Sequence, residues 1–412
     1  MSTESRDGVR AQKEGTGGER PYPFTPVQAL DLHTLYQQAR KNEPLCPVRM
    51  PYGDPGLLVT RYEDVRTVFT DPRFRRSVPE GTDQPRVTPE LMPMGLMEMD
   101  PPDHTRIRRL IAGSFTAQRA ERMRPSTERL ADSLLDAMVA AGPPADLVRD
   151  FAVPFPIGVI CDLLGVPYQD RHRFHQWVTE VNQLAGGDSA PARLESLGEL
   201  LAYMGGLIQT RRSDPADDLI SELVVAHDQD DRLSEDELVF LCMLLLIAGY
   251  ETTANEIANF AYVLFTHPDQ LALLKARPEL LPDAVEELLR FTPLTVCAAY
   301  PRYATTDVEL GGGTVPAGSP VLTSTNAANR DPGIFDGPDL LDLTRSTGRQ
   351  HLAFGHGPHH CVGASLARME LQVALGALLT RLPDLRLAGS PDSVDWKTGL
   401  LFRGPEKLSV AW

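Results

Sequence analysis

The sequence predicts a mainly α-helical fold with a small β region. Three observations lead to this prediction. Apolar residues recur at the helical spacing in seven segments of the chain. Short β-branched runs between Gly and Pro turns gather mainly at residues 302–323. No Pro/Ser-rich linker divides the chain, so we expect a flexible polar leader at 1–20 and a single domain over 21–412.

The expected elements follow in order along the chain. Residues 57–69 predict a strand that runs into a short helix, and the tail at 399–412 predicts a hairpin. Ser234 and Glu237 form a capping box that opens a helix of roughly thirty residues, about three times the mean length, so we expect this helix to cross the whole domain. Helical periodicity covers 117–140, 156–164, 172–185, 190–212, 234–266, 279–290 and 364–381.

Charge and cysteine usage exclude several classes of function. The formal charge of −16 argues against nucleic acid and anionic membranes as main partners, because both bind basic surfaces. The five cysteines form no CxxC pair, which is typical of a protein from a reducing cytoplasm. The longest apolar run, residues 238–250, is too short to span a bilayer. We therefore expect a soluble cytoplasmic protein.

One polar stretch, residues 353–365, holds three histidines, three glycines and one cysteine. Zinc binding would need four ligands, usually from two separated pairs, but His356, His359, His360 and Cys361 lie on one short loop. A nucleophilic thiol would need a strand–turn–helix elbow and a His–Asp partnership, and neither is visible. Both alternatives stay open, but a haem-iron ligand explains more of the residues.

The surroundings of Cys361 favour a thiolate that ligates haem iron. The residue precedes a helical pattern, whose N-terminal dipole and free N–H groups stabilise a negative sulfur. Gly357 lets the loop turn, and Gly363 lets a flat macrocycle approach the helix backbone. Phe354 is positioned seven residues earlier, where it can shield the sulfur from water.

Residues 354–363, FGHGPHHCVG, resemble the cysteine-ligand loop of the cytochromes P450, Phe-x-x-Gly-x-x-x-Cys-x-Gly. The resemblance implies the haem-thiolate triangular prism of that family, with haem b and with Cys361 as the axial ligand of the iron. Segments such as TRYEDVR and LLFRGPEKL look most like actinomycete P450s that tailor macrolides and other polyketides.

A second motif lies in the middle of the long helix. A mid-helix Thr usually bonds to the carbonyl four residues earlier, and a buried carboxylate needs a partner or a purpose. The family resemblance implies that this segment crosses over the haem. Ala248 and Gly249 would then make room for dioxygen, while Glu251 and Thr252 would organise protons for O–O cleavage.

The same resemblance implies two further groups of residues. His104 and Arg108, one helical turn apart, would bind the haem propionates together with Arg302 and His359. A structural ion cluster would join Glu287 and Arg290, three residues apart, to Arg345.

The implied reaction inserts one oxygen atom from O2 into a C–H or C=C bond. Electrons would come from NAD(P)H through a ferredoxin reductase and a ferredoxin, and we expect a monomer. The alternatives are a P450-fold peroxygenase and a non-oxygenating or carrier-recruiting relative. The pocket is expected to take a bulky lipophilic substrate. Its predicted lining is Met94, Leu96, Met97, Leu244, Ala248, Leu294, Thr295, Val296, Cys297 and Leu401.

Overall fold

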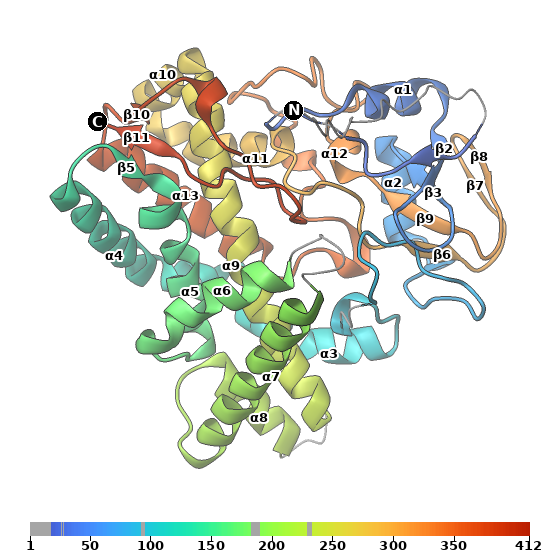
Figure 1. Cartoon of the computed structure of the whole chain (residues 1–412), viewed down its shortest axis with the longest axis horizontal. Helices are drawn as coiled ribbons and strands as arrows, with labels where there is room; N and C mark the ends of the chain where they lie inside the picture. The colour runs from blue at the N-terminus through green and yellow to red at the C-terminus, as the bar shows by residue number, and fades with distance from the viewer. Residues whose placement is uncertain (1–17, 26, 28, 92–94, 183–189, 229–232) are drawn as a thin grey trace, which may run out of the picture.

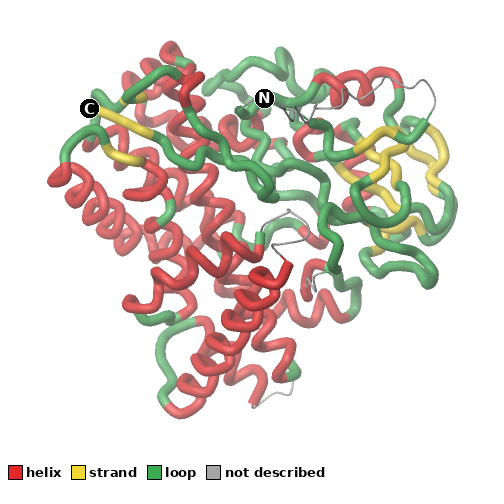
Figure 2. Tube along the Cα trace, viewed as in Figure 1, coloured by secondary structure: helices red, strands yellow, loops and turns green. Residues whose placement is uncertain are grey.

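The computed structural model of the chain describes residues 18–412 except 26, 28, 92–94, 183–189 and 229–232. Helices dominate these residues and strands gather in two small regions (Figure 2), which confirms the predicted fold class. The helices are α1 (Thr34–Asn42), α2 (Tyr62–Thr70), α3 (Asp103–Ala112), α4 (Ala117–Ala141), α5 (Pro154–Leu164), α6 (Arg171–Val181), α7 (Ala190–Ser213), α8 (Leu219–Asp228), α9 (Glu235–Thr266), α10 (Pro268–Ala276), α11 (Leu281–Phe291), α12 (Thr325–Ala328) and α13 (Ala364–Arg381).

The main sheet has six strands in the order β1-β2-β3-β9-β6-β4. The strand predicted to run into a helix is confirmed, because β3 is followed at once by α2. Strands β7 and β8 form a separate hairpin within the predicted β stretch. The strands of the chain are β1 (Arg20–Pro21), β2 (Leu45–Arg49), β3 (Gly56–Val59), β4 (Phe74–Arg75), β5 (Ala145–Asp146), β6 (Arg302–Ala304), β7 (Val308–Leu310), β8 (Gly313–Val315), β9 (Pro320–Thr323), β10 (Arg386–Leu387) and β11 (Ser409–Ala411).

The hairpin predicted for the tail is wrong. The last strand, β11, lies between β10 and β5, and Val410 stands opposite both Leu387 and Ala145. Alternation of side chains identifies a strand but not its partner. The tail therefore completes a three-stranded sheet with a strand from the first half of the chain.

Helix α9 crosses the molecule, as predicted (Figure 1). The Ser234 side chain accepts from the N–H of Glu237, whose carboxylate accepts from the N–H of Ser234, so the predicted capping box is confirmed. By length and composition α9 is the one helix among the described residues that could span a membrane. Over half of its apolar window is buried inside the protein, as expected for a core helix.

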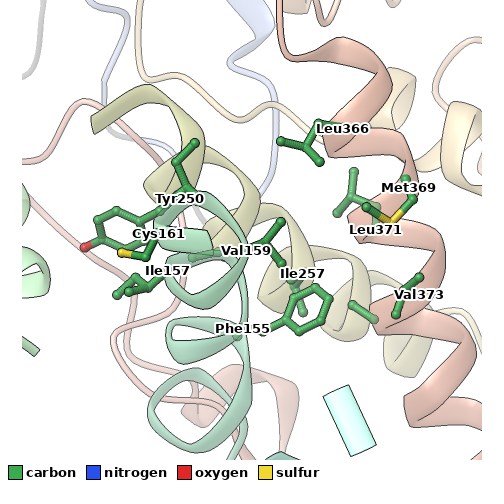
Figure 3. Packing of buried hydrophobic residues seen from close by; sticks show 14 of the residues in the cluster. Phe155, Ile157, Val159, Cys161, Tyr250, Ile257, Leu366, Met369, Leu371 and Val373 are labelled. Carbon is green, nitrogen blue, oxygen red and sulfur yellow. The ribbon is translucent and has the colours of Figure 1, made fainter. Parts of the chain in front are cut away.

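The helical core is built around α9. Helices α5 and α13 both pack against α9, and α13 also packs on α4. Figure 3 shows apolar side chains of the three helices converging, among them Phe155 from α5, Ile257 from α9 and Leu371 from α13. This core holds α9 and the start of α13 in fixed positions relative to one another, and those two segments carry the P450-like motifs.

Most of the predicted helices are confirmed, with ends within two residues for α4, α5, α7, α9, α11 and α13. Helix α6 ends at Val181, and the remainder of its predicted range extends into residues outside those described. Helices α1, α8 and α10 were not predicted, because nine or ten residues show too little periodicity. Arg20, the last residue of the predicted leader, is the first residue of β1.

Candidate active site

A cavity of about 430 Å³ lies between α9 and the loop that precedes α13. Ala248, Gly249 and Thr252 line it from α9, and Phe354 and Cys361 line it from the loop. The two motifs are far apart in the sequence, and the fold brings them to the walls of one cavity.

Local hydrogen bonds shape the cysteine loop. The N–H of Cys361 donates to the carbonyl of Phe354 at 2.9 Å, which closes the loop on itself. Gly357 has φ +70°, and a Cβ there would lie 2.6 Å from the carbonyl oxygen of Phe69. Glycine is therefore required at this position both by backbone conformation and by close approach to α2. Gly363 has an ordinary φ of −81° and no contact closer than Cys361 Sγ, at 3.9 Å from an added Cβ.

Cys361 differs from the other four cysteines, which are buried. Its exposed surface faces the cavity, because the residue lines the cavity wall. Enclosure by protein raises the pKa of the thiol, while the N–H of Gly363 and the guanidinium groups of Arg108 and Arg368 oppose this rise. A bound metal ion would reverse the balance, since coordination deprotonates a thiol.

Phe354 is held by a charged neighbour from α13. The guanidinium of Arg368 lies 4.6 Å from the centroid of the Phe354 ring and pairs with Glu286 at 2.7 Å. Burial opposes ionisation of Glu286, but hydrogen bonds from His351 and Arg368 hold its pKa at about 2. The ring that was predicted to shield Cys361 is thus clamped in place.

Two arginines and two histidines lie together along one edge of the cavity, which we call the cationic edge after its arginines. His104, Arg108, Arg302 and His359 all line it, and the rings of His104 and His359 are 4.0 Å apart between centroids. Among the described residues, Nε2 of His104 and both Nε and Nη2 of Arg302 have no hydrogen-bond partner. Burial and the neighbouring charge of Arg76 lower the pKa of Arg302 to about 9.

This donor set fits the carboxylates of a haem. The buried guanidinium of Arg302, with two unpartnered donor atoms, requires an anionic ligand, and charge-assisted hydrogen bonds to a carboxylate satisfy it best. All four residues predicted as propionate contacts are brought together at this edge. Arg76 lines the same cavity and was missed, since a lone Arg after a short strand carries no pattern.

On the side of α9 that lines the cavity, Thr252 bonds within its own helix and Gly249 is packed against α5. The Thr252 hydroxyl donates to the carbonyl of Ala248 at 3.0 Å, as a mid-helix Thr usually does. Gly249 lines the cavity, but a Cβ there would lie 2.6 Å from Cδ1 of Ile160. Contact with α5 therefore requires this glycine, in addition to any need for space near the haem.

Glu251 is not among the cavity-lining residues; its side chain is 4% exposed. The amide of Asn182 donates to its carboxylate, and Lys397 lies near enough to act on its charge. Burial raises the pKa of Glu251 to about 7, against the opposing effects of Lys397 and Asn182. Sequence reasoning missed both partners, because the residue after α6 and the segment before the tail reach α9 only in the fold.

The Glu287–Arg290 pair of the structural cluster is fully buried. Glu287 and Arg290 are 0% exposed and pair through two contacts of 2.7 and 2.8 Å. Arg345 adds a contact of 3.0 Å to the same carboxylate, which also accepts the N–H of Asp342. The three residues predicted for this cluster are thus brought together by the fold.

Most residues predicted for the substrate pocket line the cavity. A smaller cavity of about 160 Å³ adjoins it and shares Leu244 and Leu401. The prediction for Val296 has to be corrected, because Val296 is not among the lining residues and packs against an apolar cluster beside the cavity. Met94 lies outside the described residues. The predicted residues that do line the cavity are Leu96, Met97, Leu244, Ala248, Leu294, Thr295, Cys297 and Leu401.

The structure does not support the zinc alternative. Across the described part of the chain, no three His, Cys, Asp or Glu side chains come together in a way that could hold a metal ion. The histidines of the loop spread around Cys361 instead, and His359 turns to the cationic edge beside His104.

Comparison with known proteins agrees with this geometry. Residues 193–403 match the family model described as Cytochrome P450. The chain is 51% identical to mycinamicin IV hydroxylase/epoxidase of Micromonospora griseorubida, over 95% of this chain and 98% of that protein. It is 49% identical to nocardicin C N-oxygenase of Nocardia uniformis subsp. tsuyamanensis, over 95% and 98%.

Solved structures match over nearly the whole length. The crystal structure of HinD with NMFT and NO has a TM-score of 0.92 and 49% identity, covering 96% of this chain and 100% of that one. A mutant of the mixed-function P450 MycG in complex with mycinamicin IV has a TM-score of 0.88 and 50% identity, with the same coverage. The chain therefore belongs to the cytochrome P450 family and is a P450 monooxygenase related to those of actinomycete macrolide pathways.

Proposed function

We propose that this P450 inserts one atom of O2, by hydroxylation or epoxidation, into a bulky lipophilic natural product of the macrolide or polyketide type. The observation that carries the proposal is the meeting of Cys361, Thr252 and a cationic edge around one cavity. P450s use haem and O2, and the donor set of this cavity fits a haem.

The residues of the cysteine loop and of the cationic edge would hold the cofactor. Bound haem would supply the iron centre at which O2 is activated, and Cys361 Sγ would bind that iron. His104, Arg108, Arg302 and His359 would bind the two carboxylates of the haem. Phe354 would keep water from the sulfur, and Gly357 and Gly363 would let the loop and helix backbone approach the ring.

The residues of α9 would deliver protons. The Thr252 hydroxyl donates to a carbonyl of its own helix, which leaves its oxygen free to accept a further hydrogen bond from the cavity side. Glu251, with a pKa of about 7, can both take up and release a proton at neutral pH. Asn182 holds the Glu251 carboxylate on one side and lines the outer cavity on the other. This arrangement supports a proton path from the outer cavity through Glu251 to Thr252.

The substrate would occupy the apolar part of the cavity. Its walls include Leu244, Leu294 and Leu401, and the adjoining outer cavity adds Phe240 and Ile247. Relatives of this chain carry names from macrolide pathways, which supports a large polyketide as the substrate class. We further propose that the enzyme is a cytoplasmic monomer that receives NAD(P)H electrons through a ferredoxin reductase and a ferredoxin.

The thiolate ligand is tested by the spectrum of the reduced protein with CO. Wild type should show the strongly red-shifted Soret band of a thiolate-bound haem, and Cys361→Ser should lose it. Cys161→Ser, which changes a buried cysteine in α5, is the matched control and should keep the band. A band that survives in Cys361→Ser would refute the assignment.

Turnover distinguishes the proposal from its alternatives. With NADPH, a surrogate reductase and ferredoxin, and a macrolide panel chosen by low-spin to high-spin Soret shifts, a monooxygenase yields product that contains one atom of O2. A P450-fold peroxygenase would yield product with peroxide alone, and a carrier-recruiting relative would yield none under either condition.

A further inference from the structure

Arg76 directly follows β4, and Arg302 is the first residue of its partner strand β6 in the main sheet. Strands β4 and β6 are antiparallel, with Phe74 opposite Ala304 and Arg75 opposite Tyr303. Arg76 lies in the bend just beyond these paired positions, and both Arg76 and Arg302 line the cavity. Like charges that are close together destabilise each other. The fold thus places two guanidinium groups together at the cationic edge.

The protein holds Arg76 firmly but leaves part of it without a partner. Its Nη1 donates to the carbonyls of Tyr300 and Pro301 at 2.8 and 3.3 Å, and its backbone N–H is held by Asp100 at 2.9 Å. Its Nε is buried and has no hydrogen-bond partner among the described residues. The residue lines the cavity that contains Cys361. The guanidinium is therefore fixed in direction, with one donor still to be satisfied.

The pKa values of Arg76 and of two neighbouring groups reflect burial and the positive charge of Arg76. Burial lowers the pKa of Arg76 itself to about 10. Arg76 also contributes, after burial, to the lowered pKa values of Arg302 and His104. Nε of Arg302 is unpartnered as well. Arg302 is buried and Arg76 is half-buried, and each has a buried donor without a hydrogen-bond partner at the cavity, which the carboxylate of a bound ligand would satisfy.

We propose that Arg76 is a further haem-carboxylate ligand, which shares one propionate with Arg302 in addition to the four contacts expected from the P450 motifs. The inference rests on the proposed haem site, since the haem provides the carboxylate. It also gives the carbonyls of Tyr300 and Pro301 a role, because they orient the Arg76 guanidinium toward the cofactor. Tyr300 lines both cavities, so its contact with Arg76 connects the cationic edge to the outer cavity.

Haem loss from the holoenzyme tests the proposal without measuring activity. Transfer of haem to an excess of an apomyoglobin acceptor is followed by the Soret band for wild type, Arg76→Gln and Arg76→Lys. Removal of one hydrogen bond to a charged group should make Arg76→Gln lose haem about 10- to 100-fold faster. Arg76→Lys keeps the charge but not the planar fork, and should fall between the two. Arg75→Gln is the matched control, since Arg75 is exposed and projects from the opposite face.

Reconstitution with haem dimethyl ester separates a ligand from a merely structural residue. The ester lacks carboxylates, so wild type and Arg76→Gln should then lose it at the same rate. Equal acceleration with both haems would show that Arg76 acts only by holding the Tyr300 segment, and no acceleration with either would show that it does not touch the propionate; each result overturns the proposal. The reduced CO spectrum of wild type decides the haem-thiolate assignment separately.

Discussion

Glu251→Gln tests whether a buried acid is retained at a cost in stability. Burial raises the pKa of Glu251 from 4.5 to about 7. In the unfolded chain the carboxyl ionises near 4.5, whereas in the folded protein it stays protonated up to about 7. Folding therefore loses stability as pH rises from 4.5 to 7, and the full loss persists above 7. The two pKa values correspond to about 3 kcal/mol.

Gln keeps the shape of the side chain and cannot ionise, so the variant escapes this loss. We expect Glu251→Gln and wild type to unfold at similar urea concentrations at pH 5, and the variant to be more stable by about 3 kcal/mol at pH 8. Glu235→Gln, at the exposed start of the same helix, is the control. Hydrogen bonds from Arg212 lower the pKa of Glu235, so this variant should differ from wild type by the same amount at both pH values.

Turnover should move in the opposite direction. Loss of the proton carrier should slow turnover at pH 7.5 with nearly unchanged substrate affinity, and it should increase the solvent isotope effect, because a relay acts after binding. The reasoning fails if the stability difference does not change between pH 5 and pH 8. Weaker substrate binding with normal turnover would instead make Glu251 a pocket residue.

Two further predictions concern α9 and the buried ion cluster. Thr252→Ala should bind substrate and accept electrons normally but release more peroxide per NADPH consumed; unchanged product yield per NADPH would assign proton delivery to another group. Glu287→Gln leaves two guanidinium groups without a charged partner at a site that is 0% exposed, and should cost about 3–5 kcal/mol in urea unfolding. Glu279→Gln removes an exposed pair with Arg277 and should leave the midpoint nearly unchanged; equal losses in both variants would contradict the cluster's role.

The motifs that could be predicted from the sequence are those whose residues are close together along the chain. The loop at 354–363 is closed by one hydrogen bond between residues seven apart, and Gly357 needs its positive φ wherever the loop is placed. The capping box of α9 joins residues three apart. Local backbone geometry determines both features, so a pattern of ten residues or fewer carries the information.

Positions that depend on a distant partner could not be predicted in the same way. Val296 has the apolar character of a pocket residue, but it does not line the cavity and packs against a cluster that includes Tyr22 and Leu322. Gly249 was interpreted through the haem, whereas the side chain of Ile160 on α5 also requires it. In each case the deciding neighbour lies far away in sequence and leaves no periodic signal near the residue.

The sequence by itself determined the helical class, the long central helix, the cysteine loop and thereby the family. Only the tertiary structure decided which distant residues contact one another and how their charges interact. It placed Asn182 and Lys397 around Glu251, paired the last strand with β5, and brought Arg76 and Arg302 to the wall of one cavity. The physical reason is that hydrogen bonding and turn geometry within a segment act over a few residues. Burial and charge pairing, which fix the pKa of an acid or the need for an anion, depend on what the whole chain brings together in space.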